Sequence, residues 1–240
     1  MLPEYADMDA ENLAGETTQR ISQHPDWKYV LREFYNVYRF SSSGGSKLIG
    51  AHMRVVQARL SRVLTSDPAL NLIPPDRKPV TAHLGRTLDN GEEERTHSFV
   101  RALAKISGEL TWQYGYDKMP RSLENKYAYS EIMGPRGPIV CDDLILGLVL
   151  FAPDCTYPAH SHSDITESYY CLSGFVSQNH AGVYPPGSLL FNAPGYEHAI
   201  TTSKFEPVLL AYVWVGDVQT LGGFQMSFSR KRKIRIDTPI

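Results

Sequence analysis

The fold and function of this chain are constrained most by a pair of histidines that are separated by one residue and followed closely by a glutamate. His160 and His162 lie two positions apart, and Glu167 follows five residues after the second. In a β-strand, residues i and i+2 project from the same face, so the two imidazoles can converge on one point. His198 comes later, after a glycine-containing turn. We therefore expect His160, His162, Glu167 and His198 to hold a metal ion, with Tyr169 beside it as a reactive group.

The predicted ligands are chemically suited to a divalent transition metal. Neutral imidazole and carboxylate both bind Zn, Mn and Fe in the divalent state, and the residue types alone do not choose among these three. Three histidines and one carboxylate leave room for water or substrate, which is typical of catalytic metal sites. The alternative is a metal-free site in which the same side chains only hydrogen bond to each other and to water.

The chain around this motif consists of short apolar runs separated by glycine and proline. Many short strands with turn signals at close intervals indicate a β-sandwich or a β-barrel. The predicted strands cover residues 144–151, 167–172, 188–192, 198–202, 207–216 and 224–229.

The first half of the chain has helical periodicity instead. Apolar residues recur at helical spacing over residues 26–40, 47–64 and 92–112, which predicts three helices. Asp26 is the expected N-cap of the first helix. We predict a helical region over residues 1–120 that packs on a β domain over residues 121–240, with the metal site in the β domain.

The composition limits the kinds of partner and the cellular compartment that are expected for this protein. The net charge of −2 gives no reason to expect nucleic acid or an anionic membrane as a partner. The three cysteines form no C-x-x-C pair, and an odd count argues for a reducing compartment. No signal peptide and no run of about 20 apolar residues is visible. We therefore expect a soluble, cytoplasmic protein.

The spacing of the candidate ligands resembles the two motifs of the cupin superfamily. The first motif has the pattern H-x-H, three or four residues, E, six residues, G, and it is matched by His160, His162, Glu167 and Gly174. The second is matched by Gly187, Pro194, Gly195 and His198. Its proline directly precedes the glycine, and Thr202 replaces a frequent asparagine. The resemblance implies a mainly β protein, a cupin-type β-barrel (jelly-roll) preceded by a helical N-terminal region.

The flanks of the motif resemble one group of cupins, the dimethylsulfoniopropionate (DMSP) lyases. The resemblance lies in LGLVLFAPDCTYPAH over residues 146–160, ESYYCLSG over 167–174, and WVGD over 214–217. The length and the helical N-terminal half are similar to the DddL type. Membership would imply a lyase that cleaves DMSP to dimethyl sulfide and acrylate by β-elimination. It would also imply the four metal ligands above, Tyr169 as general base and Tyr157 as a second active-site tyrosine.

The sulfonium group of DMSP is a cation, and aromatic faces attract such cations. Tyr170, Tyr212 and Trp214 lie within the motif strands and are candidates for binding the substrate, with core packing as the alternative for each. The expected partner is this small molecule. A homodimer paired through sheet edges is a further expectation, since cupins often pair in this way.

Two other functions fit the same fold. One is another metal-dependent cupin enzyme, a dioxygenase or an isomerase, that acts on a small carboxylate. The other is a non-enzymatic sensor of small molecules, but such regulators usually add a basic recognition helix. The predicted N-terminal helices have no basic face of this kind, and the near-neutral charge also argues against a sensor.

Overall fold

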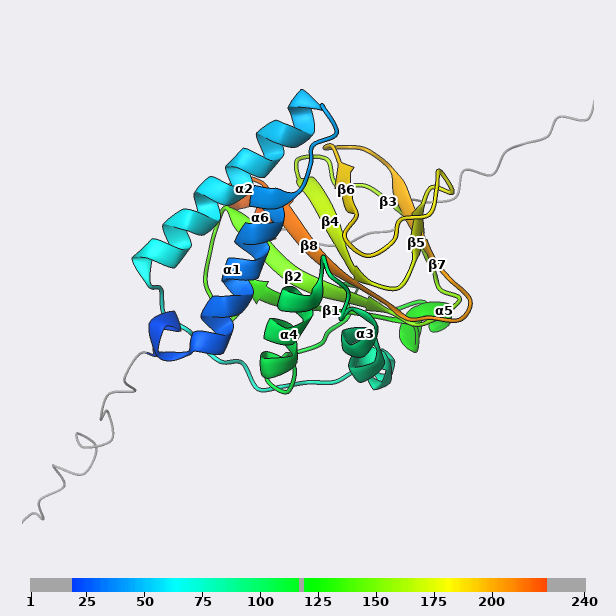
Figure 1. The fold of residues 1–240 in the computed structure, drawn as a ribbon, viewed down its shortest axis with the longest axis horizontal. Helices are drawn as coiled ribbons and strands as arrows, with labels where there is room; N and C mark the ends of the chain where they lie inside the picture. The colour runs from blue at the N-terminus through cyan, green and yellow to red at the C-terminus, as the bar shows by residue number, and fades with distance from the viewer. Residues whose placement is uncertain (1–18, 117–118, 224–240) are drawn as a thin grey trace, which may run out of the picture.

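The computed structural model of the protein describes residues 19–116 and 119–223. The helices of its first half are α1 (Pro25–Phe40), α2 (Lys47–Ser66), α3 (Leu84–Asn90) and α4 (His97–Ile106), with the 3-10 turns η1 (Ile21–Gln23) and η2 (Pro79–His83). After α5 (Arg121–Glu124) come the strands β1 (Tyr127–Met133), β2 (Leu144–Phe151), β3 (Thr156–His160), β4 (Thr166–Ser173), β5 (Val176–Gln178), β6 (Leu189–Asn192), β7 (His198–Thr202) and β8 (Val208–Val215), and then α6 (Val218–Gly223). Figure 1 shows the helices of the first half on one side of the strands.

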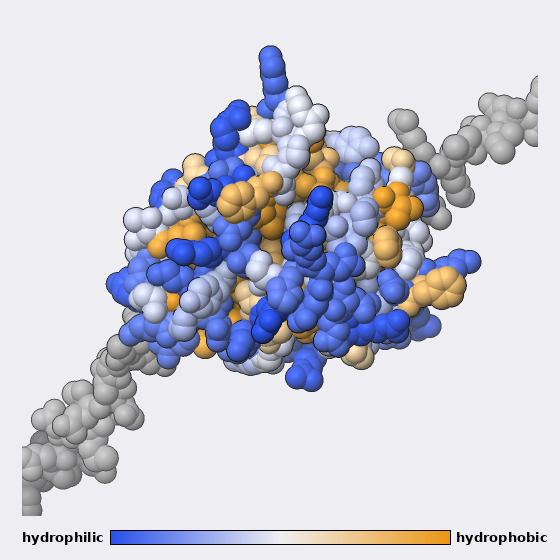
Figure 2. Space-filling model, in the orientation of Figure 1, coloured by the Kyte–Doolittle hydropathy of each residue, from blue (hydrophilic) through white to orange (hydrophobic). Residues whose placement is uncertain are grey.

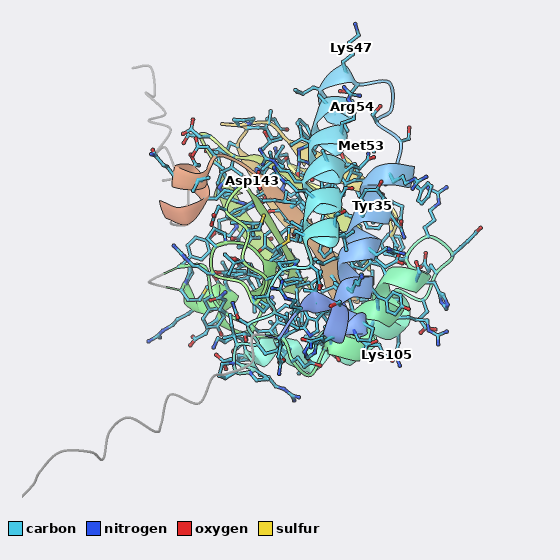
Figure 3. The ribbon with its side chains drawn as sticks, turned by 90° about the vertical axis from the view of Figure 1, so that its left-hand side faces the viewer. Tyr35, Lys47, Met53, Arg54, Lys105 and Asp143 are labelled. Atoms are coloured by element: carbon cyan, nitrogen blue, oxygen red, sulfur yellow. The ribbon has the colours of Figure 1, made fainter. Side chains whose placement is uncertain are left out.

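The N-terminal ends of α1 and α2 are explained by residues close in sequence, and the predicted cap of α1 was wrong. Pro25 occupies the first position of α1, where its missing N–H has no partner to lose. The N-cap is therefore His24, and Asp26 lies in the first turn rather than at the cap as predicted. Ser46 caps α2 by accepting a hydrogen bond from the Ile49 N–H at 3.3 Å. Figure 3 shows Lys47, Met53 and Arg54 along α2, with Tyr35 on the neighbouring α1.

The third predicted helix, over residues 92–112, is too long. Only His97–Ile106 is helical. The Thr96 hydroxyl donates to the Gly91 carbonyl at 2.6 Å and closes a turn ahead of the helix. Gly91 is packed so closely there that a Cβ would lie 2.6 Å from the Val100 side chain. Tight packing of this turn therefore replaces the first helical turn, which the acidic residues 92–94 favour because negative side chains suit the positive end of a helix.

The strands form two antiparallel sheets. One has the order β1-β2-β8-β4-β6 and the other the order β3-β7-β5. The predicted mainly β jelly-roll with a helical N-terminal region is confirmed. Among the described residues no backbone ladder joins an edge of one sheet to an edge of the other, so the expected barrel is a sandwich. Five of the six predicted strands appear within one residue or so of their predicted ends, and the sixth, over 224–229, lies outside the described residues.

The five-stranded sheet is buried on both faces. Every residue of β2 is buried, which explains its continuous apolar run. Alternate side chains of β2 enter two different cores. Leu144, Leu146, Leu148 and Leu150 pack with the helices, whereas Ile145, Val149 and Phe151 pack with residues from the three-stranded sheet. The candidate site belongs to the second of these cores, between the two sheets.

The helices bury their apolar sides and expose polar ones. Figure 2 shows a largely hydrophilic face with scattered apolar patches in the orientation of Figure 1. α1 packs against both α2 and α4, and buried residues of all three share one hydrophobic core with the sheet. The division of the chain at about residue 120 stays a prediction. No helix in the described parts of the chain has the length and apolar character that a membrane crossing needs.

Candidate metal centre and active-site cavity

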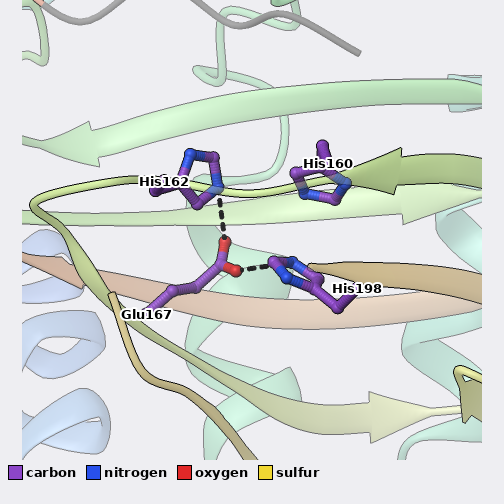
Figure 4. A group of neighbouring side chains, drawn as sticks. All are labelled: His160, His162, Glu167 and His198. Carbon is purple, nitrogen blue, oxygen red and sulfur yellow. Dashed lines mark ion pairs between the residues drawn. The ribbon is translucent and has the colours of Figure 1, made fainter. Parts of the chain in front are cut away.

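The four predicted ligands come together between the two sheets. His160 ends β3 and pairs in register with His198, the first residue of β7. His162 follows β3, and Glu167 reaches the same point from β4. One nitrogen or carboxylate oxygen of each residue lies within 4.8 Å of those of the other three, and all four residues are buried. Figure 4 shows Glu167 between His162 and His198, with His160 beside them.

The size of this cluster suits a single ion. Ligands on bonds of about 2.0–2.2 Å lie at most about 4.4 Å apart across a metal. The observed spread of up to 4.8 Å needs only a small inward movement to match. His198 Nε2 lies 2.8 Å from Glu167 Oε2, and His162 Nε2 lies 3.8 Å from Glu167 Oε1.

Backbone carbonyls orient two of the imidazoles. His160 Nδ1 lies 3.0 Å from the Pro158 carbonyl oxygen, and His198 Nδ1 lies 3.1 Å from that of Tyr196. A carbonyl oxygen only accepts, so each Nδ1 carries the proton and donates it. Nε2 of both rings is then the nitrogen that faces the cluster. This arrangement is usual for histidines that bind metals.

Glu167 is held by both neighbouring strands of its sheet. The Trp214 indole N–H on β8 donates to Oε1 at 2.6 Å, and the Asn192 side-chain amide on β6 donates to Oε2 at 3.0 Å. Trp214 and Asn192 are the two residues directly opposite Glu167 in the register of the sheet. The Gln178 side-chain amide in turn donates to the side-chain amide oxygen of Asn192, Oδ1, at 2.8 Å. These donors stabilise the ionised carboxylate and fix its direction.

The protonation states of the four cluster residues depend on burial and on their effects on one another's pKa. Burial alone would raise the pKa of Glu167, but the three histidines, His198 first among them, hold it well below its usual range. Burial and the nearby His198 lower the pKa of His160 to about 4, and burial also lowers that of His162. Burial opposes protonation of His198 too, but the Glu167 carboxylate raises its pKa. At neutral pH the cluster therefore offers one carboxylate and at least two neutral imidazoles, as metal binding requires.

The residues present fit a divalent ion. His160 Nε2 is buried and has no hydrogen-bond partner among the residues that the structure describes. A buried polar atom of this kind is costly unless something binds it. A metal at the centre of the four ligand atoms would provide that partner while the Nδ1 hydrogen bonds stay in place.

We predict that Trp214→Phe weakens metal binding by about 10–100-fold, the usual cost of removing a hydrogen bond that orients a ligand. The Glu167 oxygen would lose its indole donor while the aromatic packing stays. Titration of the metal-free protein with Zn²⁺ against a competing chelator measures the change. Trp27→Phe is the matched control, because Trp27 also donates its indole N–H to a glutamate, Glu109, at 2.7 Å, but on the helical side. Equal affinities in the two variants would contradict the role given to Trp214.

A cavity of about 300 Å³ opens beside Glu167. Its walls are rich in aromatic side chains from β1, β2, β3, β4 and β8 and from the segment between α4 and α5. They include Tyr114, Tyr116, Tyr127, Tyr129, Phe151, Tyr157, Tyr169, Tyr212 and Trp214. Gly147 on β2 makes room for one of them, since a Cβ there would lie 2.5 Å from the Tyr212 ring. The metal cluster thus faces a small aromatic chamber.

Tyr169 lines this cavity on the same face of β4 as Glu167, as the i and i+2 spacing predicts. Its ring lies 6.2 Å from that of His198, centroid to centroid. Burial, and then the adjacent Glu167 carboxylate, raise the pKa of Tyr169 well above its ordinary value. In the absence of a cation its hydroxyl is therefore protonated at neutral pH.

Tyr157 lies on the other sheet, edge-on to His160 with ring centroids 4.9 Å apart. Its hydroxyl contacts that of Tyr116 and donates to that of Tyr127 at 3.5 Å. Burial raises the pKa of Tyr157 well above 10. Both tyrosines predicted for catalysis therefore reach the same cavity from opposite sides.

The structure brings two of the three predicted substrate-binding residues to this cavity. Tyr212 and Trp214 line it. Tyr170 does not, because its side chain lies on the opposite face of β4, in the core shared with the helices. Its hydroxyl donates to the Arg95 carbonyl at 3.2 Å. Alternation along the strand separates Tyr170 from Tyr169.

Several residues of the site were not predicted. Asn192 and Gln178 position the carboxylate, and Tyr116, Tyr127 and Tyr129 line the cavity. The alternation of Tyr127 and Tyr129 is a strand signal that places both rings on one face. Nothing in the sequence indicates that Asn192 lies opposite Glu167, since that depends on how β4 and β6 pair.

Known proteins are similar to this chain in sequence and in fold. The model of the dimethylsulfoniopropionate lyase family matches residues 52–210. A protein of Cereibacter sphaeroides, provisionally assigned as the dimethylsulfoniopropionate lyase DddL, is 52% identical over 221 residues, which cover 92% of this chain and 95% of that protein.

Two solved structures of DMSP lyases share the fold. One, from a study of RdDddP and RnDddQII, has a TM-score of 0.66 at 20% identity and covers 86% of this chain and 99% of its own. DddQ from Ruegeria pomeroyi has a TM-score of 0.62 at 20% identity, and the match covers 81% of this chain and 93% of the DddQ chain. The sequence matches extend over most of the chain, and the chain belongs to the dimethylsulfoniopropionate lyase family.

Proposed function

We propose that this protein is a metal-dependent lyase that cleaves DMSP to dimethyl sulfide and acrylate by β-elimination. The observation that carries the proposal is the junction of the four-residue cluster with the aromatic cavity, where Glu167 and Tyr169 lie on one face of β4. Membership of the lyase family supports the substrate. His160, His162, Glu167 and His198 would hold one Zn, Mn or Fe ion.

The reaction needs a base and a stabilised negative charge. A proton leaves the carbon next to the carboxylate, its electron pair forms the C=C bond of acrylate, and the C–S bond breaks to give neutral dimethyl sulfide. No acid has to protonate this leaving group. The bound ion supplies positive charge beside the substrate carboxylate, which makes the adjacent proton more acidic. The protein's remaining task is to place a base within about 3 Å of that proton.

Tyr169 is the proposed general base. Burial and Glu167 keep it protonated in the metal-free protein. Positive charge nearby lowers the pKa of a phenol, and the metal and the substrate sulfonium both supply such charge. The phenolate would therefore be most favoured when both the metal and the substrate are in place. Tyr157 is the proposed second catalytic tyrosine, and its raised pKa suits a neutral hydroxyl that donates a hydrogen bond.

The aromatic walls suit the other end of the substrate. A sulfonium cation is attracted to the faces of aromatic rings, by about 2 kcal/mol or more when it is desolvated. Tyr212 and Trp214 are the proposed binding residues, and their rings lie 5.6 Å apart. Tyr170 is outside the cavity and has no place in this proposal. The cytoplasmic location and the homodimer stay predictions from the sequence.

We predict that the purified, metal-loaded protein releases dimethyl sulfide and acrylate from DMSP in equal amounts in sealed anaerobic vials. Gas chromatography of the headspace and chromatography of the solution measure the two products. The same rate with and without oxygen would exclude the alternative of a dioxygenase, which needs Fe(II) and O₂. No dimethyl sulfide above the uncatalysed rate, with metal confirmed by elemental analysis, would refute the proposed function and favour another cupin enzyme such as an isomerase.

A further inference from the structure

Three polar side chains meet inside the apolar layer between the helices and the five-stranded sheet. Ser168 on β4 is completely buried. Its hydroxyl lies 2.7 Å from that of Tyr38 on α1 and 2.8 Å from Nε2 of His52 on α2. Tyr38 is 1% exposed and His52 is 6% exposed. Two different helices therefore hydrogen bond to one residue of the strand.

That residue has a special place in the sequence. Ser168 lies between the proposed ligand Glu167 and the proposed base Tyr169. Side chains alternate along a strand, so Ser168 faces the helices while Glu167 and Tyr169 face the cavity. Fixing the direction of Ser168 also fixes the rotation of the strand about its own axis. The same contacts therefore set where the two flanking side chains point.

The surroundings of the network are apolar. Ser168 lies opposite Phe191 on β6 and Val213 on β8 in the sheet. The His52 ring packs edge-on against Phe191, with centroids 5.3 Å apart, and against Tyr38 at 5.9 Å. His52 Nδ1 is buried, and no group in the described ranges 19–116 and 119–223 hydrogen bonds to it. The network is therefore not an extension of a wet surface into the protein.

Stability alone does not explain such a network. Hydrogen bonds inside a protein replace hydrogen bonds to water, so their net gain is small, and apolar groups of the same shape are often as stable. A buried polar network has a different property, because only one placement of its members satisfies it. Apolar contacts between a helix and a sheet tolerate small shifts, whereas these two hydrogen bonds do not.

We propose that Tyr38 and His52 are positioning residues that hold Ser168, and through it set the geometry of Glu167 and Tyr169 in the active site. The proposal rests on the proposed function for the role of Tyr169, and on the metal cluster alone for that of Glu167. It assigns the helical N-terminal region a task beyond covering the sheet. Neither residue touches the substrate or the metal.

The test removes each hydrogen bond with little change of shape. Tyr38→Phe deletes one hydroxyl, and His52→Leu deletes the imidazole, whereas His52→Gln keeps a nitrogen near the position of Nε2. Tyr29→Phe and His97→Gln are the matched controls, because both residues are exposed on helices of the same layer. Three quantities are measured: release of Co²⁺ to a chelator together with its visible spectrum, kcat and KM for DMSP, and thermal unfolding of the metal-free proteins.

We expect Tyr38→Phe and His52→Leu each to speed Co²⁺ release and to lower kcat by about 10-fold, within the range for residues that orient ligands. KM should change less than about 2-fold, because the cavity walls that bind the substrate stay in place. His52→Gln should restore most of both losses. The control variants should behave as wild type.

Two results would overturn the proposal. One is wild-type Co²⁺ release and turnover in Tyr38→Phe and in His52→Leu. The other is lower thermal stability with unchanged Co²⁺ release and spectrum, which would make the network only structural. If His52→Leu does not fold, Tyr38→Phe and His52→Gln decide. Co²⁺ release needs no substrate, so it still tests the positioning of Glu167 if wild-type protein proves unable to cleave DMSP.

Discussion

Tyr169→Phe is expected to lower kcat for DMSP cleavage by about 10²–10⁴-fold, the range for loss of a general base. The change removes only the hydroxyl, so the ring keeps its packing opposite Tyr212 and Leu190 in the sheet. The hydroxyl is not among the atoms that would bind the metal. Metal content by elemental analysis should therefore equal that of wild type. Loss of turnover with full metal content separates proton transfer from metal binding.

The control for this variant is the next residue along the strand. Tyr170→Phe also removes one tyrosine hydroxyl, but on the opposite face of β4, where it donates to the Arg95 carbonyl. Turnover should stay within about threefold of wild type, since a hydroxyl that points away from the cavity makes no interaction with the reacting atoms in the transition state. A fully active Tyr169→Phe would show that another group takes the proton, with Tyr157 the first candidate. Strong loss in Tyr170→Phe would restore that residue to the substrate site.

The positions of strands along the chain were predictable where one physical signal dominated. β2 and β8 are covered on both faces, and their unbroken apolar runs identified them. β3 contains Pro158 and β5 has three residues, so neither gave a clear alternating pattern. α4 was overestimated because the glutamates before it suit a helix start, while the actual start depends on the packing of Gly91 against Val100. Such tertiary contacts are not visible in local sequence.

The residues of the candidate site also divide into those that the sequence predicted and those that only the structure shows. His160, His162 and Glu167 are close in sequence, and their spacing grouped them. The resemblance to the second cupin motif supported His198 as the fourth ligand, and the structure brings all four together. Tyr169 followed from Glu167 by the two-residue period of a strand. The donors to Glu167 did not, because Asn192 and Trp214 are its neighbours only through the pairing of β4 with β6 and β8. Tyr170 was placed at the site by its nearness in sequence, and alternation along β4 puts it on the other face.

Removal of one ligand should have the largest effect on the metal itself. We expect His162→Ala to lose the bound ion, with affinity lowered by more than the 10–100-fold that changes around a ligand cost. The His162 ring contributes one of the four converging donors, and Nε2 lies 3.8 Å from Glu167 Oε1. Alanine has no donor atom, and three remaining ligands hold a divalent ion less tightly. Elemental analysis after dialysis against a chelator measures the loss.

His97→Ala is the control, because His97 begins α4, is exposed to solvent and is not part of the four-residue cluster. It should retain metal and activity. Activity of His162→Ala should fall with its metal content and return only at high added metal, since the tyrosines of the cavity remain in place. Full metal content in His162→Ala would mean that the ion binds elsewhere. Loss of metal without loss of turnover would separate the cluster from the reaction and leave the substrate sulfonium as the one remaining proposed source of positive charge beside Tyr169, whose raised pKa then makes the phenolate harder to form.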